Sequence, residues 1–500
     1  MKKYLSLFLA ITMVAALFVG GAAVEANAEG ARDTLVISMA QEPTTVNFHA
    51  SGFVTTQQTA HLCAGYLLKI AADGSVAPYI AESWEYASDT ELVMKLREDV
   101  YWHNGRLLTA DDVVFTFEWM MNQDNGSVYF SNFNGKVEKV EKTGDFEVKF
   151  TLVAPYPPFL ELLAWNCPLV AEDIMDTLDT NPIGCGPFKF ISWDHNQQIN
   201  YEVFDQYFDR DKIAYDKLTL RCFQDSNAQM TAFLAGEVDF VNVDANDVDM
   251  IAAKEEYKIQ STQNNIWFIG CNSSVGVFAN EKVRQAAKYA IDKDEIIEIA
   301  MNGQGIPVSQ FVLPGTTYYD ESLDWTQDLE KAKQLLAEAG YPNGGCEFTL
   351  TGSNDATTRN VMTVLQYQFE AAGFKVNLNC ADAGEWWEKY TKGELEMAVN
   401  SYGVYNDPAF RTTYLLTTGS AVRFGYHNDE YDELYAKGLV ERDEEARKAI
   451  YSRMFEIAID DAGFFNLFAP ETFCGVKSEI EGLEFHDNGN SDFTGVTFKG

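Results

Sequence analysis

Hydrophobic and polar residues alternate in segment 181–241, as they do in strands that bury one face. Gly184 and Gly186 flank a cysteine ahead of a proline, and Phe188 and Phe190 then alternate with polar neighbours. The start of this segment is therefore predicted to be a turn that leads into a half-buried strand.

The rest of the same segment predicts a β-α-β unit. Residues 217–222 alternate again, and Asp225 or Ser226 stands where an N-cap of a following helix belongs. Gly236 can end that helix, because glycine readily adopts the left-handed conformation found at helix C-termini. A strand pattern resumes at 238–240.

The N-terminal half of the chain mixes strand and helix patterns. Thr34–Met39 predicts a strand, and a proline-marked turn leads to a helix expected around Thr59–Leu68. Thr109 and Asp112 are spaced as in a capping box, in which each side chain binds a free backbone N–H at the helix start. Val137–Val153 predicts a hairpin. These elements together predict an α/β lobe.

From about residue 265 onward, helical patterns dominate the sequence. A strand at 346–352, a helix at Thr358–Ala372 and a strand at 374–379 follow one another, which predicts a parallel strand pair with a right-handed crossover. A second α/β lobe is therefore expected. N-caps of its helices are expected at Asn280, Asp292 and Asp328.

Length and composition agree with two or more lobes. A chain of 500 residues is too long for one ordinary core, and 46% hydrophobic residues are enough to fill several. The chain has 37 Lys and Arg against 75 Asp and Glu, a formal charge of −38. This charge argues against nucleic acid or anionic lipid as a partner.

The N-terminus has the features of a secretory signal peptide. Two lysines precede an apolar run from Leu5 to Val19, and Ala26 and Ala28 are placed for cleavage after residue 28. An uncleaved membrane anchor is the alternative, but the run is short for a span. No cysteine follows the run at the position that lipidation requires. We therefore expect a periplasmic protein of a double-membrane cell that is not a lipoprotein.

Eight cysteines lie in the part expected to be exported, where disulfides are possible. Their pairing cannot be deduced from the sequence, and single buried thiols are the alternative. No Cys-x-x-Cys pair occurs, which argues against a zinc ribbon or a thioredoxin-type site. The cysteines are Cys63, Cys167, Cys185, Cys222, Cys271, Cys346, Cys380 and Cys474.

Seven segments, taken in order, resemble the family 5 extracellular solute-binding proteins, the dipeptide, oligopeptide and nickel receptors of ABC importers. They are LTADDVVFTFEWM, NPIGCGPFKFISW, FLAGEVDFV, NEKVRQAAKYAIDKDEII, DLEKAKQLLAEAGYP, AAGFKVNL and YNDPAF. One such match alone would be weak evidence, but seven in the family's order are strong evidence. The resemblance extends over nearly the whole mature chain.

The resemblance implies an α/β, two-lobed periplasmic binding protein-like fold of type II, similar to cluster C, with an extra subdomain in the first lobe. Hinge crossings are expected near Trp267 and near 468–472. The expected parts are a signal peptide at 1–28, lobe I at 29–266 with a subdomain inserted at about 70–180, lobe II at 267–469 and a C-terminal return to lobe I at 470–500.

The resemblance also implies the function. The protein is expected to capture a peptide or peptide-like solute in the cleft between its lobes and to deliver it to the permease subunits of an ABC importer. No Walker A pattern occurs, so the ATPase must be a separate chain. We expect a monomer with no cofactor, no bound metal and no catalytic activity.

The family's dipeptide clamp is missing from this sequence. Peptide-binding members place an aspartate for the ligand ammonium three residues before the acidic residue of an Asp-Pro pair. The pair here is Asp407–Pro408, and the third residue back is Val404. The arginine for the ligand carboxylate would fall near Gly352. Nickel-type members need a histidine just after the pair, and the nearest is His427. Free dipeptides are therefore doubtful ligands.

Aromatic residues are the remaining candidates for ligand contact, since large rings offer apolar faces with polar edges. Packing in the core is the alternative for each, and Asp407 is expected to cap a helix rather than to bind ligand. Arg411 and Arg423 could meet an acidic ligand or pair with carboxylates. The candidate ligand-binding residues are Tyr129, Trp386, Trp387, Tyr402 and Tyr405.

Other functions remain as alternatives. The same fold could bind an oligosaccharide or a metal chelate, or also serve a chemoreceptor. An exported hydrolase would be of another class, but neither Gly-x-Ser-x-Gly nor His-Glu-x-x-His occurs. Cys185 and His195 could be proposed as a nucleophile pair, but a small turn residue is the simpler interpretation of Cys185.

Overall fold

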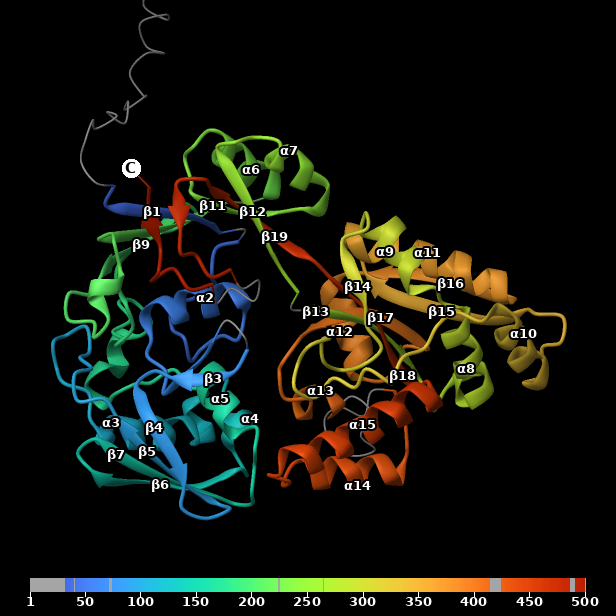
Figure 1. Ribbon diagram of the computed structural model, residues 1–500, viewed down its shortest axis with the longest axis horizontal. Helices are drawn as coiled ribbons and strands as arrows, with labels where there is room; N and C mark the ends of the chain where they lie inside the picture. The colour runs from blue at the N-terminus through green and yellow to red at the C-terminus, as the bar shows by residue number, and fades with distance from the viewer. Residues whose placement is uncertain are drawn as a thin grey trace, which may run out of the picture.

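The chain folds into two bodies that lie side by side, each built on its own β-sheet (Figure 1). We call the body with the seven-stranded sheet lobe I and the body with the six-stranded sheet lobe II. The predicted signal peptide, residues 1–28, lies outside the described residues, as does Arg423. The computed structural model describes residues 32–39, 41–71, 74–223, 225–263, 265–413, 424–485 and 491–499.

The lobe I sheet runs in the order β12-β19-β11-β1-β10-β9-β8. Strand β1 pairs in parallel with both β10 and β11, so it lies between the two strands of the predicted β-α-β unit. Helix α6 (Ser226–Leu234) joins those strands, and its N-cap is Asp225, which accepts the N–H of Ala228. The strands are β1 (Thr34–Met39), β8 (Phe188–Asp194), β9 (Gln198–Val203), β10 (Lys217–Cys222), β11 (Phe240–Val243), β12 (Tyr257–Thr262) and β19 (Thr472–Lys477).

A second, smaller sheet of lobe I is antiparallel, in the order β4-β5-β7-β6. The hairpin predicted at 137–153 is confirmed, because β6 pairs with β7. Buried apolar residues of this sheet pack with those of α3 and α5 in one core. The elements are β4 (Ala81–Tyr86), β5 (Glu91–Leu96), β6 (Val137–Gly144), β7 (Glu147–Leu152), α3 (Ala110–Met120), α4 (Phe130–Phe133) and α5 (Phe159–Trp165).

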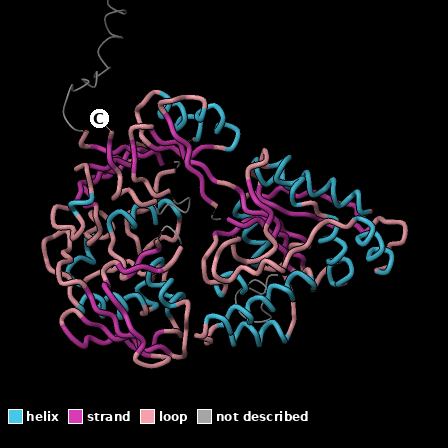
Figure 2. The backbone as a smooth tube through the Cα atoms, in the orientation of Figure 1, coloured by secondary structure: helices cyan, strands magenta, loops and turns pink. Residues whose placement is uncertain are grey.

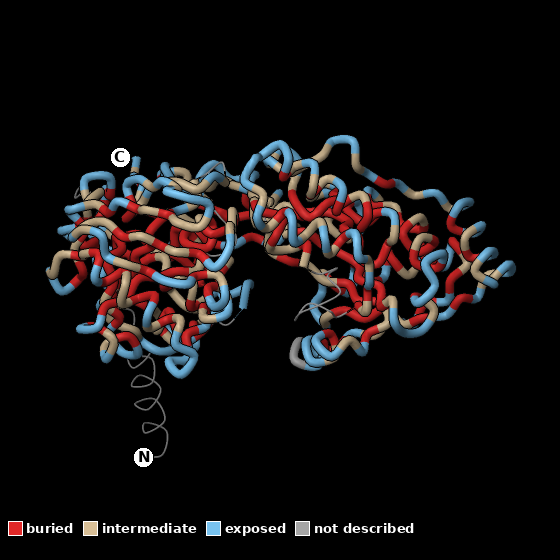
Figure 3. The backbone as a smooth tube through the Cα atoms, turned by 90° about the horizontal axis from the view of Figure 1, so that it is seen from below, coloured by how far each residue is buried: buried red, intermediate tan, exposed pale blue. Residues whose placement is uncertain are grey.

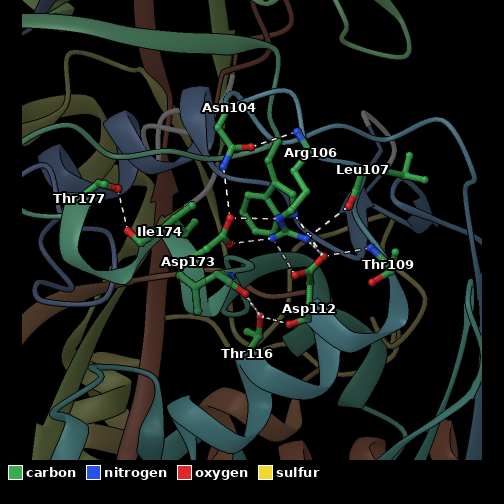
Figure 4. A network of polar contacts seen from close by, with 11 residues as sticks. Asn104, Arg106, Leu107, Thr109, Asp112, Thr116, Asp173, Ile174 and Thr177 are labelled. Carbon is green, nitrogen blue, oxygen red and sulfur yellow. Dashed lines mark hydrogen bonds and ion pairs between the residues drawn. The ribbon is translucent and has the colours of Figure 1, made fainter.

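The capping box at the start of α3 is confirmed, and it belongs to a larger polar network (Figure 4). The carboxylate of Asp112 accepts the backbone N–H of Thr109 at 3.0 Å. It also pairs with the guanidinium of Arg106, which binds the carboxylate of Asp173 as well, at 3.0 Å. Because Asp173 lies in the short helix Glu172–Thr177, this network joins three segments of lobe I.

The prediction of a helix around Thr59–Leu68 is wrong at both ends, because the helix lies about one turn earlier in the chain. Helix α2 spans Val54–Cys63, and the strand β2 begins at Leu68. The carbonyl of Cys63 accepts the N–H of Gly186 at 2.9 Å, so the 184–186 turn ends the helix by pairing with its last residue. Glycine is required in this turn, since a Cβ on Gly184 would lie 1.9 Å from the Cys63 oxygen.

The lobe II sheet runs in the order β14-β18-β13-β17-β15-β16, and the predicted parallel pair is β15 with β16. Helix α11 crosses between them, as the pattern indicated. The strands are β13 (Asn265–Cys271), β14 (Gly305–Pro307), β15 (Cys346–Ser353), β16 (Phe374–Ala381), β17 (Met397–Gly403) and β18 (Phe464–Pro470).

Helices cover the lobe II sheet and form its outer part (Figure 2). Asn280, Asp292 and Asp328 cap α8, α9 and α10, as predicted. The helices are α8 (Glu281–Ala290), α9 (Lys293–Ala300), α10 (Leu329–Glu338), α11 (Ala356–Ala372), α12 (Ala383–Thr391), α13 (Ala409–Thr412), α14 (Asp429–Gly438) and α15 (Glu444–Asp461).

The chain passes between the two large sheets in two places, from β12 to β13 and from β18 to β19. Strands β12 and β19 pair with each other in lobe I, so the two connections leave that lobe together. Buried segments concentrate in two separate bodies on either side of this connection (Figure 3). This arrangement is the expected two-lobed α/β fold.

All eight cysteines lie in the described part of the chain, and no two of them form a disulfide there. None of the described helices combines the length and the apolar character needed to cross a bilayer. The remaining elements are β2 (Leu68–Ile70), β3 (Val76–Pro78), α7 (Val248–Ala252), β20 (Ile480–Glu481) and β21 (Thr497–Phe498).

Candidate functional site

A hollow of about 280 Å³ lies where the two lobes meet. In lobe I its walls come from α2, from α4 with the loop before it, and from the end of α5. In lobe II they come from the end of β17, the loop after it and α13. The lining residues are Gly52, Val54, Gln57, His61, Val128, Tyr129, Asn132, Trp165, Asn166, Gly403, Val404, Tyr405 and Arg411. A solute in this hollow would contact both lobes.

Tyr129 and Gln57 form the polar part of the lobe I wall. The Tyr129 hydroxyl donates to Oε1 of Gln57 at 2.6 Å, and the amide of Gln57 donates to the carbonyl of Ser51 at 2.9 Å. The Tyr129 ring meets the ring of His49 edge-on, with 5.4 Å between centroids. Burial raises the pKa of Tyr129, so its hydroxyl stays protonated.

His61 contributes a neutral imidazole to the same wall. Its ring stacks on Tyr66 with centroids 4.7 Å apart and meets Trp165 edge-on at 6.1 Å. Desolvation lowers the pKa of His61 to about 3, because burial disfavours the charged imidazolium. The lobe I wall therefore carries rings and polar groups but no charge from this histidine at neutral pH.

Arg411 and Tyr405 form the lobe II wall. Nε of Arg411 donates to the carbonyl of Gly403 at 2.8 Å. Its guanidinium lies over the rings of Tyr405 and Tyr402, 4.8 and 5.3 Å from their centroids. These contacts hold the guanidinium plane against the aromatic rings at the edge of the hollow.

The five predicted ligand-binding aromatics fall in different places. Tyr129 and Tyr405 line the hollow from opposite lobes. Trp386 stacks on a neighbouring tyrosine in the lobe II core and is 4% exposed, and Tyr402 is also buried there, with its hydroxyl bound to an asparagine. Trp387 is 55% exposed but is not among the described residues that line the hollow.

Asp407 has a structural role in lobe II. Its carboxylate accepts the N–H of Ala409, the first residue of α13, although the N-cap position of that helix is Pro408. Both of its oxygens also bind the guanidinium of Arg447 on α15, at 2.6 and 2.9 Å, and both side chains are buried. This bidentate pair fixes the loop that presents Tyr405 to the hollow.

Contacts between the lobes occur beside the hollow, and the central one involves Glu161 of α5. Its two carboxylate oxygens accept the backbone N–H groups of Asn406 and Asp407 at 3.2 and 3.1 Å. The amide of Asn406 also donates to the carbonyl of Gly74. At the edge of the interface, Arg442 of lobe II pairs with Asp89 of lobe I at 3.1 Å.

Burial raises the pKa of Glu161 to about 8. Desolvation is the largest cause, and the nearby Asp407 carboxylate acts in the same direction. The two backbone N–H groups and the Arg447 guanidinium oppose these effects. The contact between the lobes therefore contains a carboxyl group that titrates near neutral pH.

Comparison with known proteins assigns the family. The model of the bacterial extracellular solute-binding proteins, family 5 Middle, matches residues 75–423. The chain belongs to the family 5 solute-binding proteins. This assignment confirms the resemblance based on the seven sequence segments, and it places the protein among extracellular binding proteins.

Relatives of this solute-binding protein differ in their ligands. Heme-binding protein A of Haemophilus influenzae is 28% identical over 465 residues, covering 85% of this chain and 84% of that protein. The oligopeptide-binding protein AppA of Bacillus subtilis is 26% identical over 491 residues, covering 90% of this chain and 89% of that protein. The structure of the ABC transporter substrate-binding protein CtaP of Listeria monocytogenes superposes on this one with a TM-score of 0.86 at 25% identity. The superposition covers 94% of this chain and 100% of that chain.

Other positions singled out by the family resemblance lack ligand-binding groups. Val404 lines the hollow where peptide-binding members were expected to have an aspartate. A Cβ on Gly352 would lie 2.5 Å from a methyl of Thr358, so the backbone there leaves no room for an arginine. His427 is exposed and lies 3.3 Å from Asp429. The described residues contain no cluster of three His, Cys, Asp or Glu suited to a metal ion.

The suggested nucleophile pair is not assembled in this solute-binding protein. Cys185 is buried in the turn beside α2, and desolvation raises the pKa of its thiol. His195 is largely exposed and binds Glu42 at 3.1 Å. A buried protonated thiol is a poor nucleophile, so the interpretation of Cys185 as a small turn residue fits the geometry.

Several residues at the junction of the lobes of this solute-binding protein carry no signal in the sequence. Glu161 and Arg447 lie on helices whose local patterns contain nothing unusual. Asn132 and Asn166 line the hollow but stand in segments without a recognisable motif. Only the meeting of residues far apart in the chain gives them a role, and no local signal could have identified them.

Proposed function

We propose that this family 5 protein captures a peptide or peptide-like solute in the hollow between its lobes and delivers it to the permease subunits of an ABC importer. The observation that carries the proposal is the composition of the hollow, whose walls come from both lobes. A ligand that contacts both walls favours the form in which the lobes meet. The permease can then distinguish the loaded protein from the empty one.

The proposal includes the organisation of the chain. Residues 29–266 together with 470–500 act as lobe I, with an inserted subdomain at about 70–180, and residues 267–469 act as lobe II. The lobes move about the two connections between the large sheets. The protein works as a periplasmic monomer released from its signal peptide, and a separate ATPase drives the permease. What supports these points is the family assignment and the N-terminal apolar run.

The ligand class can be tested on the purified mature protein, residues 29–500. Native mass spectrometry would identify any solute that co-purifies, and thermal unfolding would then be measured with separate panels of peptides, oligosaccharides and metal chelates. A ligand at a hundredfold excess over its Kd stabilises the bound form by about 2.7 kcal/mol. We expect peptides or peptide-like compounds to raise Tm and a simple dipeptide such as Ala-Ala to bind weakly.

Two variants separate binding in the hollow from binding elsewhere. Tyr405→Ala removes a ring from the hollow, and Tyr367→Ala removes a ring that is 67% exposed on α11. The first variant should lose most of the ligand-induced rise in Tm and the second should keep it. A rise with sugars or chelates alone would contradict the peptide proposal, and no rise with any panel would contradict a receptor function.

A further inference from the structure

The charge of the hollow is opposite in sign to the charge of the protein. The chain has 75 Asp and Glu against 37 Lys and Arg, yet none of the thirteen described lining residues is acidic. Arg411 is the one lining residue in the described part that is charged at neutral pH, because His61 is neutral there. The described lining of the hollow therefore carries a single positive charge.

The guanidinium of Arg411 is held in place but not neutralised. Nε is bound to the Gly403 carbonyl, and no carboxylate of the described residues lies within ion-pair distance of the group. Arg442 and Arg447, which also lie where the lobes meet, are instead each paired with an aspartate. A planar guanidinium whose two Nη groups bind none of the described residues offers the fork of donors that a carboxylate accepts in bidentate fashion.

The wall opposite Arg411 is polar but uncharged. The side-chain amides of Asn132 and Asn166 line it, and no described residue binds either amide. The described lining has no carboxylate for a ligand ammonium, and a desolvated ammonium without a partner is costly. Rings of Tyr129, Trp165 and Tyr405 lie between these polar groups and suit an apolar or aromatic body.

Taking the proposed function as its basis, we infer that the solute carries a carboxylate and no free ammonium group, and that Arg411 binds the carboxylate. The uncharged end of such a solute faces the asparagine amides of lobe I. An N-acylated peptide and a small aromatic acid share this chemistry. Arg411 is thus the residue that determines the preferred charge of the ligand.

Calorimetry with five probes tests this inference. N-acetyl-Phe-Ala is compared with its C-terminal amide, which removes the carboxylate charge, and with Phe-Ala, which adds an ammonium. 3-Phenylpropionate is compared with its amide as a pair without peptide bonds. We expect each acid to bind at least about tenfold more tightly than its amide, the range typical of a hydrogen-bonded charge. N-acetyl-Phe-Ala should also bind more tightly than Phe-Ala.

Three variants assign the effect to the guanidinium. Arg411→Gln should reduce the affinity for the acids to that for the amides, and Arg411→Lys should restore part of the difference. Arg359→Gln is the matched control, since Arg359 is exposed on α11 and binds Asn354. Thermal unfolding of each variant without ligand shows whether it is folded. If Arg411→Gln does not fold, the comparison of wild type with Arg411→Lys still tests the inference.

The outcomes separate this inference from the proposed function. Equal affinity for acid and amide, an unchanged acid affinity in Arg411→Gln, preference for Phe-Ala, or no binding of any probe would each overturn the inference. Equal binding of the acetylated peptide and its amide would leave the peptide proposal standing. Arg411-dependent binding of 3-phenylpropionate, without binding of any peptide probe, would support the inference and contradict the peptide proposal.

Discussion

We predict that the carboxyl group of Glu161 makes the proposed closing of the lobes sensitive to pH. It accepts two backbone N–H groups of lobe II, and burial in this contact raises its pKa from the ordinary value of 4.5 to about 8. If the lobes separate, the side chain loses these partners and returns to water, where the ordinary value applies. The closed form then holds a proton that the open form has lost, throughout the range between the two values.

The sign of the effect follows from this difference in bound protons. Closing is favoured when the pH is low enough for the carboxyl group to be protonated, and this contribution is fully present below about pH 4.5. It is lost as the pH rises through about 8, because the ionised carboxylate must then be desolvated. Each pH unit inside the window changes the free energy of closing by up to about 1.4 kcal/mol. Ligand affinity should fall on the order of 50-fold between pH 6 and pH 8.

Isothermal titration calorimetry between pH 5.5 and 8.5, with the ligand that co-purifies, measures this dependence. Glu161→Gln replaces the carboxyl group by a neutral amide of the same shape, and its affinity should change less than about threefold over the range. Glu118→Gln is the matched control, since Glu118 is exposed on α3 of the same lobe, and it should follow the wild type. Equal pH slopes for wild type and Glu161→Gln would refute the reasoning.

Three further predictions concern the scaffold and the hollow. Arg447→Ala should lower the free energy of unfolding by about 3–5 kcal/mol, because it leaves the buried Asp407 carboxylate unpaired. Urea unfolding in a double-mutant cycle with Asp407→Asn measures the coupling energy between the two residues, and a value below about 1 kcal/mol would contradict this. Gly184→Ala should destabilise by about 3 kcal/mol or more, because its Cβ would meet the Cys63 oxygen, and an unchanged urea midpoint would show that the turn can move. Tyr129→Phe should keep ligand affinity within about threefold while Tyr129→Ala loses about tenfold or more, and equal losses in calorimetry would show that the hydroxyl, not the ring, makes the contact.

Elements with a complete local signal were predictable. The strand at Thr34–Met39, the capping box at Thr109 and the hairpin at 137–153 all occur as their patterns indicate. The same is true of the parallel pair at 346–352 and 374–379. In each case the apolar period and the turn or cap residues lie within a few positions of one another, so no distant contact is needed.

The end of helix α2 shows why some boundaries were not predictable. The apolar pattern continues past Cys63, but the carbonyl of Cys63 binds Gly186, more than a hundred residues later in the chain. The aromatics near the hollow show the same limit. Tyr402 and Tyr405 are three residues apart, and yet one is buried in the core while the other lines the hollow. The direction of each ring depends on packing against segments that are distant in sequence.

The sequence by itself determined the family, the α/β class, the caps of several helices, and the absence of the expected peptide clamp at Val404 and Gly352. Tertiary structure decided which side chains share the junction of the lobes. It brought Glu161 to the backbone of Asn406, and it placed Arg411 in a hollow where no described residue supplies an acidic partner. Local patterns report periodicity and backbone preference, whereas charge balance and pKa depend on burial among partners that only the folded chain assembles.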